Sequence, residues 1–165
     1  MVMRVSKEEL VAVLSQFNPW WRDEVIADLP KWRRAAFREL HGWLTNPPAP
    51  RAVLISGARQ IGKTTLMLQA ADALLRDGVT PANILYATFD HPILKLAGID
   101  AVLEAWRERE PKADGPEYLF LDEAQFIRDW GTWVKHQVDF RKERRIAFTG
   151  SAMPLVEVDQ ESGVG

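Results

Sequence analysis

One nine-residue segment combines glycines, a lysine and threonines at a spacing that suits phosphate binding. The segment Gly57-Ala58-Arg59-Gln60-Ile61-Gly62-Lys63-Thr64-Thr65 fits the pattern G-x-x-x-x-G-K-[ST]. Its glycines let the backbone curl with amide hydrogens pointing inward, and the start of a following helix adds unpaired N–H groups. Lys63 supplies a cation for the β and γ phosphates of a nucleotide, and Thr64 supplies a hydroxyl for Mg²⁺. A turn that only capped a helix would not explain a lysine at a helix start, where cations are unfavourable. The segment therefore predicts a nucleotide phosphate site.

Two adjacent acids follow a short apolar run at residues 118–121. In a parallel sheet, ligands bind outside the carboxyl ends of the strands, so Asp122 is expected beside the phosphate loop. There it would hold Mg²⁺ directly or through water. Glu123 is expected to orient and deprotonate a water that attacks the γ phosphate.

Hydroxyl groups end a further predicted strand, in the segment Thr149-Gly150-Ser151. A hydroxyl at this edge would bind the γ phosphate or the attacking water. The residues do not choose between Thr149 and Ser151, and an ordinary strand-ending turn with glycine is the other interpretation.

Alternating strands and helices must position these groups. Short apolar runs predict strands at 52–56, 84–89, 118–121 and 145–149, and helices are predicted at 63–76, 100–109 and 129–140. Asp100 and Asp129 are the expected N-caps of the last two helices. Because the strands are continuously apolar instead of alternating, they predict an α/β fold with a mostly parallel sheet and helices on both faces.

The first 46 residues are predicted to be helical and rich in tryptophan, with helices at 7–17 and 31–44. The second helix would bury a face made of Trp32, Ala36, Leu40 and either Trp43 or Leu44. We expect residues 1–46 to pack on a core formed by residues 47–153, with residues 154–165 as a tail. A docking surface for another chain is the alternative role of the tryptophans.

Composition narrows the class of protein. The chain has 165 residues, 47% of them hydrophobic, and a net charge of −2, which excludes a generally basic nucleic-acid coat. Arg141–Arg145 is a basic cluster, interpreted as a solvated loop with DNA contact as the alternative. The absence of cysteine excludes disulfides and thiolate zinc sites, and the three histidines have no metal-binding spacing. Without a secretion signal or an apolar run long enough for a bilayer, we expect no membrane contact and a cytoplasmic location.

The motifs, in this order, resemble those of AAA-type P-loop ATPases. They are residues 55–65, Phe89-Asp90, Leu119–Gln125, Asp129-Trp130 and Thr149–Ser151. The resemblance spans about residues 33–153 and is greatest to prokaryotic ATPases whose AAA-like core precedes a poorly characterised carboxy-terminal domain. It implies an ASCE-type P-loop fold with a sheet of strand order 5-1-4-3-2. It also implies that Lys63 and Thr64 belong to the Walker A motif, and that Asp122 and Glu123 form the Walker B motif. A polar sensor residue is implied at Thr149 or Ser151. The resemblance also suggests that Arg59 and Gln125 lie near the site.

The likeness implies a Mg²⁺-dependent ATPase that binds ATP and ADP. The chain stops at Gly165, before a fifth strand, a lid or an arginine for the γ phosphate, so we expect a truncated core with weak turnover. An uncovered sheet edge or the tryptophan-rich segment would then favour self-association or a partner protein. A nucleotide-gated switch without significant hydrolysis is the main alternative, and a small-molecule kinase is a second one.

Overall fold

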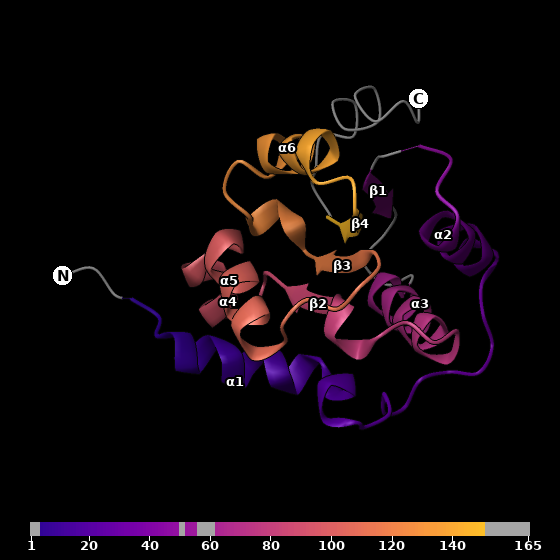
Figure 1. The fold of residues 1–165 in the computed structure, drawn as a ribbon, viewed down its shortest axis with the longest axis horizontal. Helices are drawn as coiled ribbons and strands as arrows, with labels where there is room; N and C mark the ends of the chain where they lie inside the picture. The colour runs from indigo at the N-terminus through magenta and orange to yellow at the C-terminus, as the bar shows by residue number, and fades with distance from the viewer. Residues whose placement is uncertain (1–3, 50–51, 56–61, 151–165) are drawn as a thin grey trace.

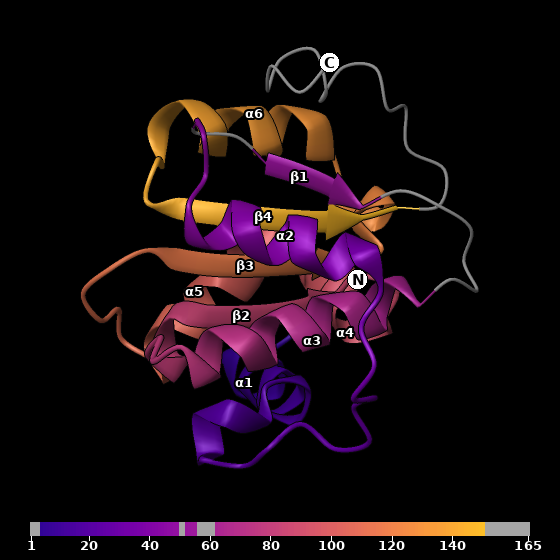
Figure 2. The same cartoon turned by 90° about the vertical axis from the view of Figure 1, so that its right-hand side faces the viewer.

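Four parallel strands form the centre of the molecule (Figure 2). The computed structural model describes residues 4–49, 52–55 and 62–150. The strands are β1 (Ala52–Ile55), β2 (Ile84–Thr88), β3 (Glu117–Asp122) and β4 (Arg144–Thr149), in the order β1-β4-β3-β2. All three strand pairs are parallel, and β2 and β3 are buried along their whole length. The predicted parallel α/β sheet and the order 1-4-3-2 are confirmed.

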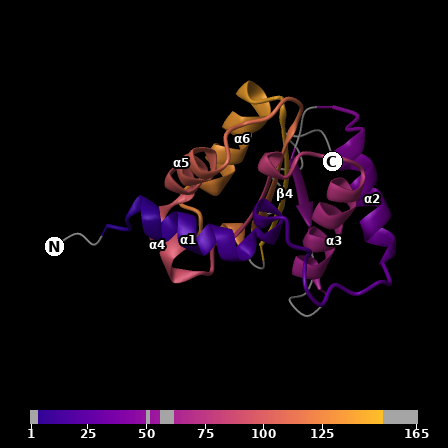
Figure 3. The ribbon, with the colours of Figure 1, turned by 60° about the horizontal axis from the view of Figure 1, so that its bottom comes forward.

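Helices cover both faces of the sheet (Figures 1 and 3). On one face lie α2 (Ala35–Thr45) and α3 (Lys63–Arg76), and on the other lie α4 (Pro92–Ala97), α5 (Ile99–Arg109) and α6 (Trp130–Phe140). The first helix, α1 (Lys7–Phe17), packs against α4, α5 and β2. Within residues 4–49, 52–55 and 62–150, no helix has the length and apolar character needed to span a membrane.

The segment after α1 covers the outer edge of β2. Asn18 is fully buried, and its side-chain amide donates to the Tyr86 carbonyl at 2.9 Å while its side-chain oxygen accepts from the Tyr86 N–H at 2.7 Å. The indole N–H groups of Trp20 and Trp21 both donate to the Ile84 carbonyl at 3.0 Å. These side chains take the place of a neighbouring strand, because backbone N–H and C=O groups at the edge of a sheet are costly to bury without a partner.

The second helix starts later than predicted, at Ala35 instead of residue 31. The Gln69 side chain donates to the carbonyls of Pro30 and Trp32, which keeps this stretch out of a helical hydrogen-bond ladder. Trp32 consequently lies outside the helix and is 62% exposed. Phe37 occupies the buried face in place of Ala36, which is exposed.

Of the two predicted helix caps, Asp100 is wrong, whereas Asp129 is confirmed in position but not in its side-chain contact. The helix α5 begins after Gly98, which has a φ of 88° and lies between α5 and the unpredicted helix α4. Asp100 therefore lies in the first turn of α5 and is not its N-cap. Asp129 occupies the N-cap position of α6, but it has a left-handed φ of 54° and its side chain makes no capping hydrogen bond. In both places a backbone turn, rather than an aspartate side chain, starts the helix.

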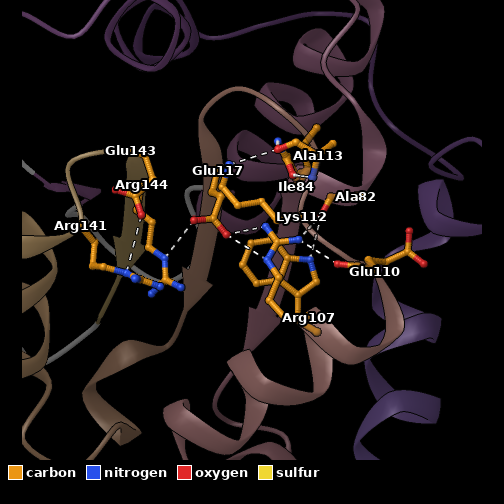
Figure 4. A network of polar contacts seen from close by, with 12 residues as sticks. Ala82, Ile84, Arg107, Glu110, Lys112, Ala113, Glu117, Arg141, Glu143 and Arg144 are labelled. Atoms are coloured by element: carbon orange, nitrogen blue, oxygen red, sulfur yellow. Dashed lines mark hydrogen bonds and ion pairs between the residues drawn. The ribbon is translucent and has the colours of Figure 1, made fainter.

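A buried carboxylate between two arginines joins the amino ends of β3 and β4 to α5 (Figure 4). Glu117 is 2% exposed and accepts hydrogen bonds from Arg107 at 3.0 Å and from Arg144 at 3.2 Å. Burial alone would raise the pKa of Glu117, but the Arg107 hydrogen bond and the Arg144 charge outweigh it and hold this pKa below its ordinary value. Arg145 bonds the Leu44 carbonyl and the Tyr118 hydroxyl. The interpretation of residues 141–145 as a solvated loop is therefore wrong for the two arginines that begin β4.

Candidate active site

The predicted site residues that the structure describes meet at the carboxyl edge of the sheet. In the strand register, Ile55 lies beside Thr149, and Thr88 lies beside Asp122. The helix α3 begins at Lys63 on the same edge, following β1 in the chain. The predicted loop residues Gly57, Ala58, Arg59, Gln60 and Ile61 lie outside the described residues, as does Ser151.

The end of the phosphate-loop segment has the backbone that its glycine predicts. Gly62 adopts φ 75° and ψ 39°, a left-handed conformation that a side chain rarely tolerates. A Cβ atom at this position would lie 3.4 Å from Nη2 of Arg34, a residue that the sequence analysis did not single out. Gly62, the N-cap residue of α3, has no side chain that could cap the helix, and Lys63, the first residue of the helix, is 5% exposed. Gly62 therefore precedes α3 in a conformation that glycine favours, and the unpaired N–H groups at the start of this helix suit an anion.

Three hydroxyl groups converge on the Asp122 carboxylate. Thr64, in the first turn of α3, donates to Oδ2 at 2.5 Å, and Tyr86 of β2 donates to the same oxygen at 2.7 Å. Thr149 at the end of β4 donates to Oδ1. Because these donors come from three separate elements, the orientation of the carboxylate is set by the tertiary structure around it.

Glu123 follows Asp122 in a left-handed conformation, with φ 52° and ψ 46°. Its N–H donates to the Thr149 hydroxyl at 3.0 Å, so Thr149 contacts both acids. Its carboxylate accepts a hydrogen bond from the Gln125 side-chain amide at 2.6 Å. A non-glycine residue with positive φ is strained, and such conformations persist where surrounding contacts hold them. Here the Thr149 bond and the short 3₁₀ helix at Ala124–Phe126 hold it.

Tyr86 is a component of this site that the sequence analysis missed. Its hydroxyl donates to the Asp122 carboxylate, although the residue lies within a strand interpreted only as apolar core. Burial, the Asp122 charge and the Asp122 hydrogen bond raise the pKa of Tyr86, so the phenol stays protonated and acts as a donor. The sequence signal that could have identified Tyr86 is the two-residue period of side chains along a strand. Tyr86 and Thr88 share one face of β2, and Thr88 pairs with Asp122.

Asp90 and His91 follow β2. Their side chains accept hydrogen bonds from residues on the two sides of the turn that joins β2 to α4. The Thr88 hydroxyl donates to Asp90 at 2.7 Å, and Nδ1 of His91 accepts from the N–H of Ile93 at the start of α4. The Phe89 N–H donates to the Asp122 carbonyl at 2.9 Å. This turn therefore extends the pairing of β2 with β3 past the strand end.

The donor set suits a hard divalent cation. A threonine hydroxyl and a carboxylate are oxygen ligands of the kind that Mg²⁺ prefers, and Mg²⁺ commonly uses one or two protein ligands together with phosphate oxygens. Over residues 4–49, 52–55 and 62–150, no group of three His, Cys, Asp or Glu residues forms a metal cluster. Thr64 and Asp122 are the described residues that would hold the ion.

Comparison with known proteins agrees with this architecture. The AAA domain family matches residues 49–165. A Haemophilus influenzae protein described as uncharacterized is 32% identical over 107 residues, which cover 62% of this chain and 26% of that protein. The chain thus spans about a quarter of the length of this relative. The fold is similar to a solved structure described as a DNA replication initiation factor, with a TM-score of 0.50 and 18% identity over 83% of this chain and 42% of the other.

Proposed function

The chain belongs to the AAA domain family, and on this basis we propose that it is the ATP-binding core of a Mg²⁺-dependent ATPase. One observation carries the proposal: the Thr64 hydroxyl lies 2.5 Å from the Asp122 carboxylate, although the two residues are 58 positions apart. A hydroxyl at the start of a helix and an acid at a strand end form the pair that would hold Mg²⁺ beside bound phosphates.

Each residue has a distinct part in the proposed reaction. Lys63 and the amides at the start of α3 would stabilise charge that develops on the transferring phosphoryl group. Thr64 and Asp122 would hold Mg²⁺, which neutralises phosphate charge when bound. Glu123 would accept a proton from the attacking water, and Gln125 and Thr149 keep it in place through its carboxylate and its N–H.

Two substitutions test the proposal by separating binding from chemistry. The Lys63→Ala variant is expected to lose ATP binding, because the loop loses its cation. The Glu123→Gln variant is expected to keep ATP affinity and lose hydrolysis, since an amide accepts no proton from water. Calorimetry with ATP and Mg²⁺ measures binding, and phosphate release measures hydrolysis.

Matched controls come from exposed residues away from the site. Lys142→Ala removes a lysine near the start of β4, and Glu39→Gln neutralises an exposed carboxylate of α2. Neither change is expected to alter binding or hydrolysis. Equal hydrolysis by the wild type and Glu123→Gln would remove Glu123 from its role, and absence of heat on adding ATP with Mg²⁺ to the wild type would refute the proposed function.

A nucleotide-gated switch is a second candidate, favoured by the link from the tryptophan-rich segment to the site. Asn18 bonds the Tyr86 backbone on one side, and the Tyr86 side chain bonds Asp122 on the other. A nucleotide bound beside Asp122 would thus change the contacts of the segment that covers β2, through Tyr86 and Asn18. Tight ATP binding with ATP remaining intact for hours would favour this function over hydrolysis.

A further inference from the structure

The position of Tyr86 makes it an unusually rigid hydrogen-bond donor. It lies in the middle of β2, paired with Phe120 of β3 on one side and bonded by Asn18 on the other. Its ring packs near the Phe17 ring, with centroids 6.0 Å apart, and the residue is 5% exposed. Little freedom therefore remains for the phenol hydroxyl that reaches Asp122.

The three hydroxyls around Asp122 are not equivalent. Thr64 is exposed, and in the proposed site it would face the metal as well as Asp122. Thr149 contacts Oδ1, the other oxygen. Tyr86 is the buried strand residue that donates to Oδ2 at 2.7 Å, the same oxygen that accepts from Thr64.

From this arrangement we propose that Tyr86 is a positioning residue for Mg²⁺, holding the Asp122 carboxylate in the orientation that completes the metal site with Thr64. The inference rests on the proposed function, because it assumes that nucleotide and Mg²⁺ bind here. A purely structural tyrosine would affect folding alone. A positioning tyrosine affects the part of nucleotide affinity that depends on the metal.

The chain supplies a matched control, because it has two tyrosines and both are buried in neighbouring strands. The Tyr118 hydroxyl accepts a hydrogen bond from Arg145, the second residue of β4. Arg145 lies at the amino end of the strands, whereas Asp122 lies at their carboxyl end. Tyr86→Phe and Tyr118→Phe each remove one buried hydroxyl and keep the ring. Only the first change removes a donor from Asp122.

The experiment is calorimetric titration with ADP, once with Mg²⁺ and once with a chelator, and thermal unfolding verifies that each variant is folded. Tyr86→Phe is expected to match the wild type with chelator and to bind ADP about tenfold more weakly with Mg²⁺, in line with loss of a hydrogen bond to a charged group. Tyr118→Phe is expected to match the wild type in both titrations.

Two results would overturn the inference alone: an unchanged Mg²⁺ effect in Tyr86→Phe, or an equal loss of affinity with and without the metal. If the wild type binds no ADP under either condition, the proposed function fails and this inference fails with it. The wild-type titrations therefore separate the two failures.

Discussion

Thr149 donates its hydroxyl proton to the Asp122 carboxylate and accepts the N–H of Glu123, so one side chain joins both acids of the site. The contact spans two neighbouring strands, because Asp122 ends β3 and Thr149 ends β4. Thr149 and Ser151 were equal candidates for the polar residue at this edge. Thr149 contacts both acids, and because Ser151 lies outside the described residues, a role of either residue as the sensor stays a prediction.

Replacing Thr149 with valine is expected to impair hydrolysis more than binding. Valine has a similar volume but neither holds Asp122 nor accepts the Glu123 N–H. We expect hydrolysis to fall about 100-fold, because a small misplacement of a catalytic group has an effect of this size. The buried N–H left without its acceptor should lower the free energy of unfolding by about 1–3 kcal/mol. Phosphate release and urea unfolding measure the two effects.

Thr132→Val is the control for that change, since Thr132 is exposed on α6. It should leave hydrolysis and stability unchanged. If Thr149→Val hydrolyses ATP as fast as the wild type, Thr149 does not position the acids.

Gly62 and Gly42 should respond in opposite ways to alanine. At Gly62, with φ 75° and Arg34 3.4 Å from the added Cβ, alanine strains the backbone that precedes Lys63. Gly62→Ala is expected to weaken ATP binding about five- to thirtyfold, because the strain costs roughly 1–2 kcal/mol. Gly42 lies within α2 and a Cβ there meets no atom within 4 Å, so Gly42→Ala should raise stability by about 0.8–1 kcal/mol. Calorimetry and thermal unfolding test the pair, and equal ATP affinity in both variants would contradict the first expectation.

The buried Glu117 is expected to be important for stability and not for the nucleotide site. Glu117→Gln leaves Arg107 and Arg144 without their shared carboxylate, which should lower the free energy of unfolding by about 3–5 kcal/mol. Glu143→Gln is the matched control, because Glu143 forms an exposed ion pair with Arg141 at 3.7 Å and should contribute less than about 1 kcal/mol. Urea unfolding at neutral pH compares them, and similar losses in the two variants would contradict the assignment.

The effect of Glu117 on stability should depend on pH with a definite sign. The folded protein holds the pKa of Glu117 below its ordinary value of 4.5, so the unfolded chain takes up the proton first as the pH falls. The stability difference between the wild type and Glu117→Gln is therefore full well above pH 4.5, and it shrinks as the pH falls through the lower folded value. Unfolding series at several pH values measure this, and a difference that grows in acid would be the wrong sign.

Asn18 should stabilise the edge of β2 through its bonds to the Tyr86 backbone. Asn18→Ala leaves the N–H and carbonyl of Tyr86 without this partner, and we expect a loss of about 2–4 kcal/mol in the free energy of unfolding. The Tyr86 amide should also exchange faster with deuterium. Asn46→Ala, at the exposed carboxyl end of α2, is the control and should have little effect. Unchanged protection of the Tyr86 amide would show that Asn18 does not secure this edge.

The sequence alone determined the fold class and, apart from the helix α4, the strand and helix pattern of the core. Continuous apolar runs at β2, β3 and β4 predicted buried parallel strands because such strands are covered on both faces. The lysine and threonine after Gly62, and the two acids at the end of β3, were identifiable because local motifs have a fixed spacing. Helix starts were less well predicted at residues 31 and 100, because the side chain of Gln69 decided the first and the backbone turn at Gly98 decided the second.

Only the tertiary structure decided which groups surround the acids. Tyr86 and Thr149 reach Asp122 from different strands, and no local pattern encodes a distance between strands that are far apart in the chain. The same holds for Asn18 on the edge of β2, and for Arg144, which pairs with a buried carboxylate instead of facing solvent. Residue types and spacing therefore predicted the chemistry, whereas the orientation of each group depends on packing among elements, which local sequence does not specify.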